Sequence, residues 1–356
     1  MFYSTEARRK LEKLIDEVSP DLIYVLHFQN KISSSIFDAA KSKGIPVVHR
    51  ISDFGQICAN AHFYRPKQRD ICERCLKGSK LNAIRYKCVH DSYVYSAIKV
   101  GSLKFQEWRR LKDKVDGFVV PSRFTLQKLE NYGIDKTKLN YIPTFFNPGS
   151  LPVNPNIQYE PFALFIGRIE PEKGLYTLVN AFLETGFPLK IVGFSNTGYE
   201  QELKEYLRGK SHKIEFLGKK PFSEIQQFLS RCLFTVVPSE WYDNLPNTLL
   251  ESFAFKKCAI ATDTGSLREL VVDNQTGLLF KIKDSGDLRE KIAQLFNNPG
   301  LSRALGENAY EFLNEQFSEK KHYDSLMALF QKVILDYKNL RLRPHSSKSH
   351  EIPADY

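Results

Sequence analysis

Apolar residues recur along the chain at two alternating spacings. Leu11, Leu14 and Val18 follow the helical spacing, a short β-branched and aromatic run at 21–27 follows them, and similar alternation continues to about residue 340. Strands that alternate with helices are typical of parallel sheets. The pattern therefore predicts an α/β protein with doubly wound, Rossmann-like sheets.

A stretch between 144 and 161 contains four prolines and few apolar runs, and it divides the alternation into two series. An irregular, cysteine-containing insertion at 58–88 interrupts the first series. A chain of 356 residues has room for two cores. We therefore predict an N-terminal domain at 1–145, a linker at 146–161, a C-terminal domain at 162–340 and a disordered polar tail at 341–356.

The net charge of +10 favours an anionic partner, which could be nucleic acid, a lipid surface or a phosphate-bearing substrate. No apolar run approaches the roughly 18 residues of a membrane span, and the first residues lack the apolar segment of a secretory signal. A cytoplasmic location is therefore expected, with the six cysteines reduced. Two of these, Cys232 and Cys258, lie in strand patterns and are predicted to be small core residues.

The first candidate site is the loop that follows the predicted strand at 162–166. Gly167 allows a ligand to approach the backbone, while Arg168 and Lys173 can converge on a diphosphate before the next helix. A surface loop with two basic residues is also common, so this loop alone leaves both interpretations open.

The second candidate site contains two acids, Asp243 and Glu251, eight positions apart. Glu251 falls within a helix among apolar neighbours, so its carboxylate must face the cleft or be paired, and ribose hydroxyls suit it. The helix start at Asn247 and Thr248 offers backbone N–H groups to a phosphate. The alternative for Asp243 is an ordinary helix cap.

With these residues the chain resembles glycosyltransferase family 4, retaining enzymes with the GT-B fold, in which two Rossmann-like domains face a cleft. The resemblance extends to about residue 340 and is strongest over 162–280. It implies that Arg168 and Lys173 hold the donor diphosphate. It also implies that Glu251 holds the ribose and that Asp243 contacts the transferred sugar. Catalysis then requires no metal, because cations and the helix dipole stabilise the leaving nucleotide diphosphate.

The resemblance implies transfer of a sugar from a nucleotide diphosphate sugar to a glycan or polyprenyl-diphosphate-linked acceptor, in cell-surface polysaccharide biosynthesis. Anionic lipid at the inner face of the plasma membrane would then be a peripheral partner, and nucleic acid would not be one. Two alternatives stay open. One is a donor-binding subunit of a split transferase that is inactive alone, and the other is a nucleotide-sugar epimerase or hydrolase.

The sequence departs from the family pattern in three places. Asp243 replaces the usual Glu, and Ser52-Asp53 stands where relatives often carry His before Asp. His49 lies within a strand and is predicted to be a packed core histidine. No glycine-rich turn precedes the first strands, so we expect a shortened first domain, which a separate polypeptide completes or which leaves the product weakly active.

The insertion contains four cysteines, and their spacing, C-x13-C-x2-C-x12-C, matches a tetrahedral structural zinc site. Ordinary buried thiols are the equally weighted alternative. The residues concerned are Cys58, Cys72, Cys75 and Cys88.

Overall fold

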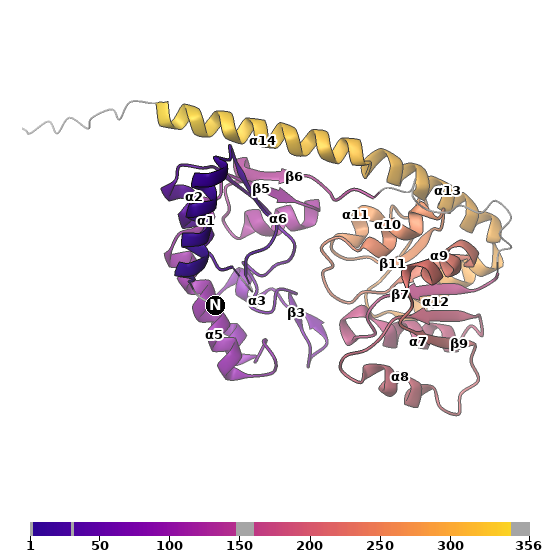
Figure 1. Ribbon diagram of the computed structural model, residues 1–356. Helices are drawn as coiled ribbons and strands as arrows, with labels where there is room; N and C mark the ends of the chain where they lie inside the picture. The colour runs from indigo at the N-terminus through magenta and orange to yellow at the C-terminus, as the bar shows by residue number, and fades with distance from the viewer. Residues whose placement is uncertain (1–2, 30–31, 147–159, 343–356) are drawn as a thin grey trace, which may run out of the picture.

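Two parallel sheets form two domains that lie side by side in a computed structural model describing residues 3–29, 32–146 and 160–342 (Figure 1). Helices accompany both sheets, so the predicted α/β fold with two Rossmann-like domains is confirmed. The predicted linker at 146–161 and tail at 341–356 fall largely outside the described residues.

The N-terminal domain is built around a parallel sheet whose central strands, β2 and β5, are almost entirely buried. Its helices and strands are α1 (Thr5–Val18), β1 (Ile23–Val25), α2 (Ser35–Ser42), β2 (Val47–Arg50), α5 (Tyr93–Trp108), β5 (Gly117–Val120), α6 (Arg123–Asn131) and β6 (Leu139–Tyr141), with 3₁₀ turns η1 (Leu111–Lys114) and η2 (Lys136–Lys138). In the described part of the chain the strand order is β1-β2-β5-β6. Buried aromatic residues, among them Phe37 and Phe118, fill the core on one face of this sheet.

The C-terminal domain has the larger sheet. Its elements are β7 (Ala163–Ile166), η4 (Pro171–Lys173), α7 (Leu175–Leu183), β8 (Leu189–Val192), α8 (Tyr199–Leu207), β9 (Ile214–Gly218), α9 (Phe222–Arg231), β10 (Phe234–Val237), α10 (Asn247–Ala254), β11 (Ala259–Thr262), α11 (Leu267–Leu270), β12 (Gly277–Phe280), α12 (Ser285–Asn297) and α13 (Pro299–Gln316). The order β12-β11-β10-β7-β8-β9 places the strand order reversal beside β7. Ligands bind at such a point in doubly wound sheets.

The insertion that sequence analysis treated as irregular contains short elements of its own. Strands β3 (Tyr64–Arg65) and β4 (Asp70–Ile71) pair antiparallel, and helices α3 (Arg74–Lys77) and α4 (Asn82–Arg85) follow. The hairpin reaches the other domain, since the Arg69 guanidinium lies 3.4 Å from the Glu202 carboxylate. The insertion therefore borders the space between the domains.

The last helix, α14 (Glu319–Leu342), connects the two domains, running from the end of α13 across the N-terminal sheet (Figure 1). Leu329 and Val333 of this helix are buried against Val48, Val119 and Ile142 of the N-terminal sheet. The sequence pattern did not predict this packing. None of the helices in the described part of the chain has the length and hydropathy that a membrane span needs.

His49 is a core residue of the N-terminal domain, as predicted. Its side chain is buried on β2, its Nδ1 lies 2.9 Å from the Val25 carbonyl oxygen, and the rings of Phe28 and Phe37 contact it edge-on. Burial lowers the pKa of His49 to about 4, so the ring is neutral at pH 7.

Candidate functional site

The loop after β7 and the loop after β10 meet at a glycine. Gly174 has a φ of 70°, and a Cβ there would lie 1.9 Å from the Pro238 carbonyl oxygen. Only glycine allows this contact, because it tolerates positive φ and has no side chain. The Glu240 N–H also donates to the Glu172 carbonyl at 2.8 Å. The two loops predicted to carry the chemistry are thus held together.

Lys173 and Asp243 form an ion pair between these loops. The Lys173 Nζ lies 2.9 Å and 3.1 Å from the two Asp243 carboxylate oxygens, and the side chains are 18% and 9% exposed. The Lys173 ammonium also lies 4.9 Å from the centre of the Trp241 ring. The ion pair therefore fixes the position of the Lys173 ammonium. The Asp243 carboxylate binds this cation instead of capping a helix, which was the alternative considered for it.

Arg168 occupies a more open position on the same loop. Its guanidinium lies 3.0 Å from the Glu172 carboxylate, and its side chain is 43% exposed. It faces a cleft of about 630 Å³ between the insertion and the C-terminal domain. The cleft is lined by His62, Tyr64, Tyr86, Lys87, His90, Arg168, Glu170, Glu172, Asn196, Thr197 and Tyr199, among others.

Gly193, in the loop after β8, allows the backbone after β7 to come close to it. A Cβ on Gly193 would lie 1.8 Å from the Gly167 carbonyl oxygen, so only a glycine at position 193 allows the two loops to pack this closely. The Glu170 carboxylate reinforces the arrangement by accepting from the Asn196 N–H at 2.8 Å and the Thr197 hydroxyl at 2.6 Å. The backbone that the sequence predicted to approach a ligand is therefore held firmly in place.

Glu251 lies on α10, half-buried, and its carboxylate has no hydrogen-bond or ion-pair partner among the described residues. Burial alone raises the pKa of this carboxyl group above its usual value. The helix begins at Asn247 without a side-chain cap, and the Thr248 hydroxyl lies 3.5 Å from the Ile166 carbonyl at the end of β7. The start of α10 therefore lies against the end of β7, and Glu251 follows on the same helix about one turn later.

Two polar atoms in the loop after β10 are buried without a hydrogen-bond partner in the described part of the chain. They are the Ser239 hydroxyl oxygen and the Trp241 Nε1. Trp241 lies between Lys173 and His62, whose ring meets it edge-on at 4.7 Å. Because unsatisfied buried groups are costly, a ligand that offers hydroxyl groups would gain by satisfying them.

Comparison with known proteins agrees with this geometry. Residues 152–312 match glycosyl transferases group 1. An uncharacterized glycosyltransferase of Methanocaldococcus jannaschii is 37% identical over 160 residues, 45% of this chain and 45% of that protein. The lipopolysaccharide core biosynthesis mannosyltransferase LpcC of Rhizobium leguminosarum bv. viciae is 27% identical over 180 residues, 48% of this chain and 50% of that protein. The chain thus spans about half the length of these curated relatives.

The fold also matches solved structures. The crystal structure of Anabaena HepE in complex with UDP has a TM-score of 0.67 and 15% identity, covering 93% of this chain and 82% of that protein. A glycosyltransferase from Rickettsia africae has a TM-score of 0.67 and 19% identity, covering 94% and 84%. This likeness confirms the GT-B fold predicted from the sequence.

The group 1 region, residues 152–312, docks onto the N-terminal domain through residues that sequence analysis missed. The Asn244 amide donates to the carbonyl oxygens of Ile51 and Ser52 at 3.3 Å and 3.0 Å, and the Thr125 hydroxyl donates to its Oδ1 at 2.6 Å. The Tyr242 hydroxyl lies 2.9 Å from the Glu73 carboxylate. More than 100 positions separate these partners along the chain, and no local sequence pattern predicts such contacts.

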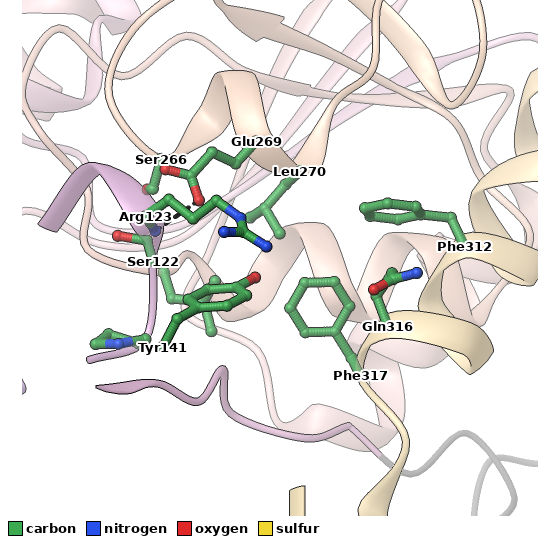
Figure 2. A pocket seen from close by; sticks show the side chains of 11 residues that line it. Ser122, Arg123, Tyr141, Ser266, Glu269, Leu270, Phe312, Gln316 and Phe317 are labelled. Atoms are coloured by element: carbon green, nitrogen blue, oxygen red, sulfur yellow. Dashed lines mark hydrogen bonds between the residues drawn. The ribbon is translucent and has the colours of Figure 1, made fainter. Parts of the chain in front are cut away.

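A second pocket, of about 250 Å³, opens where the group 1 region meets the start of α6 (Figure 2). The Glu269 carboxylate accepts from the Arg123 N–H at 2.8 Å and from the Phe124 N–H, so it caps a helix of the other domain. The Arg123 guanidinium lies over the Tyr141 ring at 4.6 Å. The segment 265–269 thus contributes an interdomain contact.

The zinc hypothesis is not supported. Across the described residues, no three or more His, Cys, Asp or Glu side chains are grouped to hold a metal ion. Cys58 is buried and its thiol donates to Asn60 Oδ1 at 3.0 Å, while Cys75 and Cys88 pack on an apolar cluster beneath α5. Burial and neighbouring cysteines, Cys72 among them, raise the pKa of Cys75 to about 11 and of Cys88 to about 12. Of the four, Cys58 is buried and the other three are half-buried, whereas Cys232 and Cys258 are fully buried core residues, as predicted.

Proposed function

We propose that this protein is a retaining glycosyltransferase that moves a sugar from a nucleotide diphosphate sugar to a glycan or lipid-linked acceptor. Support comes from the match to glycosyl transferases group 1, from the fold, and from relatives named for lipopolysaccharide core synthesis and for extending an undecaprenol-linked glycan. The setting is cell-surface polysaccharide biosynthesis.

The observation that carries the proposal is the unpaired Glu251 carboxylate. A half-buried carboxylate without a protein partner loses hydration and gains nothing in return, unless a ligand supplies donors. The two adjacent hydroxyls of a ribose both donate to one carboxylate. The pentose of the donor nucleotide therefore binds Glu251, and the diphosphate extends towards the β7 loop, beside the start of α10.

The diphosphate binds the cations and N–H groups of the β7 loop and α10. Arg168 and Lys173 supply the charge, Gly167 lets the backbone come close, and Asn247 and Thr248 present the positive end of the α10 dipole. The same groups stabilise the negative charge that develops on the leaving nucleotide diphosphate. This chain's own residues thus supply the stabilisation of the leaving group.

Asp243 contacts the transferred sugar in this proposal. It already fixes the ammonium of Lys173 at 2.9 Å, so sugar and diphosphate are bound by two members of one ion pair. Asp is one methylene shorter than the usual Glu, and the buried Trp241 Nε1 beside it offers a further donor to a sugar hydroxyl. The acceptor approaches from the cleft that Arg168 shares with the insertion.

An activity assay tests this proposal. The full chain is incubated with UDP- and GDP-sugars and a membrane extract that carries lipid-linked acceptors, and nucleotide release and the anomeric configuration of the product are measured. We expect turnover with retained configuration, lost in Asp243→Asn. Asp263→Asn is the matched control, because Asp263 is an acid of the same domain that pairs with the exposed Arg268. Donor binding without turnover under every condition would contradict the enzyme assignment.

A further inference from the structure

Helix α5 exposes an apolar stripe on the outside of the N-terminal domain. Its buried side chains, Ser96, Val100 and Leu103, face the domain, while Val94, Ile98 and Trp108 are 67%, 50% and 73% exposed. At about 100° per residue these three side chains fall within an arc of roughly 80°, so they lie on one face of the helix. α5 is therefore apolar on its solvent side as well as against the core.

The surface continues beyond the stripe. Leu81, Tyr93 and Tyr95 are 61%, 57% and 57% exposed, and they lie beside the start of α5, against which α4 packs. Contiguous exposed apolar groups on a protein of this size mark a contact with another protein or with a membrane. We define the α5 face as Leu81, Tyr93, Val94, Tyr95, Ile98 and Trp108.

Basic residues lie on the segment that carries the α5 face. Between Arg74 and Lys104 the sequence has seven lysines and arginines and one acidic residue, Asp91; of the seven, Lys80 is buried and pairs with Glu107. Arg74 and Arg85 lie over the Tyr86 ring at 4.7 Å and 5.7 Å, and Lys87 lies over the Tyr93 ring at 4.5 Å. Lys87 therefore places a positive charge on an exposed ring of the α5 face, and Arg74 and Arg85 are further exposed cations of this segment.

This combination suits the surface of an anionic bilayer better than a protein partner. Interfacial helices lie in the plane of the membrane with Trp and aliphatic side chains in the headgroup region, and lysine and arginine around them contact anionic lipids. We propose that the α5 face docks this protein on an anionic membrane, with α5 lying flat on the headgroups.

Docking at this face places the cleft beside the membrane. Lys87, His90 and Asp91 adjoin the α5 face and also line the cleft that contains Arg168. α5 lies on the side of the N-terminal domain away from α14, so docking there does not disturb the packing of α14 on the sheet (Figure 1). One part of the inference rests on the proposed function: the acceptor is then a lipid-linked one, whose diphosphate lies at the membrane surface.

Vesicle co-sedimentation of the full chain tests the inference, with vesicles of phosphatidylcholine and phosphatidylglycerol in equal amounts and with pure phosphatidylcholine as reference. We expect binding to the anionic vesicles alone, weakened by high salt. Val94→Ser combined with Ile98→Ser should lower the partition by about tenfold or more. Tyr323→Ser combined with Leu335→Ser, at exposed apolar positions of α14, is the matched control and should bind like the wild type.

A second arm separates a loss of docking from a loss of folding or donor binding. Lys77→Gln combined with Arg85→Gln, both exposed, should weaken binding to anionic vesicles and reduce its salt dependence. All variants should keep wild-type thermal unfolding and UDP affinity. A wild type that binds vesicles but not UDP would contradict the proposed function and leave the docking inference intact. Equal vesicle binding by the Val94/Ile98 variant, or binding of the wild type to single-stranded RNA but not to anionic vesicles, would overturn the docking inference.

Discussion

The two domains differ in how they carry chemistry. In the C-terminal domain the candidate residues lie on loops that follow β7 and β10 and on the helix after them, where a doubly wound sheet gathers ligand contacts. In the N-terminal domain the notable groups lie on an insertion and on the outer face of α5. We infer that one domain is organised around a small ligand and the other around surfaces. The predictions below address the C-terminal site, the core of the N-terminal domain and the contact between the two domains.

The largest effect is expected from Lys173→Ala in the C-terminal domain. The change removes a preorganised cation and leaves the Asp243 carboxylate, only 9% exposed, without its partner. By analogy with the loss of one oxyanion donor, it should cost about 2 to 4 kcal/mol of transition-state stabilisation, or roughly a thirty- to a thousandfold in kcat. Steady-state release of the nucleotide measures this. Lys220→Ala, which breaks a half-exposed ion pair with Glu224, is the control, and a kcat for Lys173→Ala close to that of this control would contradict the prediction.

An intermediate effect is expected from acid on the N-terminal domain. The pKa of buried His49 is about 4, below its usual value of 6.5, so the unfolded chain takes up a proton first as the pH falls. The contribution of the neutral His49 ring to the free energy of unfolding should be complete above pH 6.5. It should decrease by up to about 3 kcal/mol as the pH falls towards 4. Urea unfolding of the wild type and of His49→Gln across this range measures the difference, which the variant should lack. Parallel pH profiles for the two proteins would show that His49 is not responsible.

The smallest effect is expected where the domains meet. Asn244→Ala removes hydrogen bonds to Ile51, Ser52 and Thr125 and should weaken interdomain docking by about 1 to 2 kcal/mol. Small-angle scattering should then show a more open average shape while each domain stays folded. Asn308→Ala, which removes an amide contact within the C-terminal domain, should leave the shape unchanged. A wild-type scattering profile for Asn244→Ala would mean that other contacts hold the domains.

The sequence predicted the elements that follow from local patterns. The helical spacing of Leu11, Leu14 and Val18 corresponds to α1, the predicted strand at 162–166 corresponds to β7, and His49 is the core residue that its strand position indicated. Lys173 and Asp243 were predicted on separate loops, and the structure joins them across Gly174. Such local signals suffice because strand ends of one parallel sheet meet at one edge.

The remainder depends on tertiary contacts that no local pattern records. The packing of α14 on the N-terminal sheet pairs Val333 with Val48, and a helix shows its apolar stripe without showing what covers it. The side chains of Asn244 and Glu269 bond to backbone groups of the other domain. Every residue has such backbone groups, so the sequence does not indicate which of them serve as partners. The zinc hypothesis is not supported for a related reason, since cysteine spacing indicates a ligand type but not how the side chains are arranged in space.

The most direct test of the central claim is calorimetric titration with UDP of the wild type and of Glu251→Gln over a range of pH. Hydrogen bonds to a charged group are worth about 1.5 to 3 kcal/mol, so the variant should bind UDP roughly ten- to a hundredfold more weakly at pH 7. Burial raises the pKa of Glu251 above its usual value, and protonation removes acceptor capacity. Wild-type affinity should therefore fall as the pH decreases through that raised pKa, more steeply than that of the variant, in which only the ligand titrates. Equal affinities and parallel pH profiles would contradict the binding of the nucleotide ribose by Glu251.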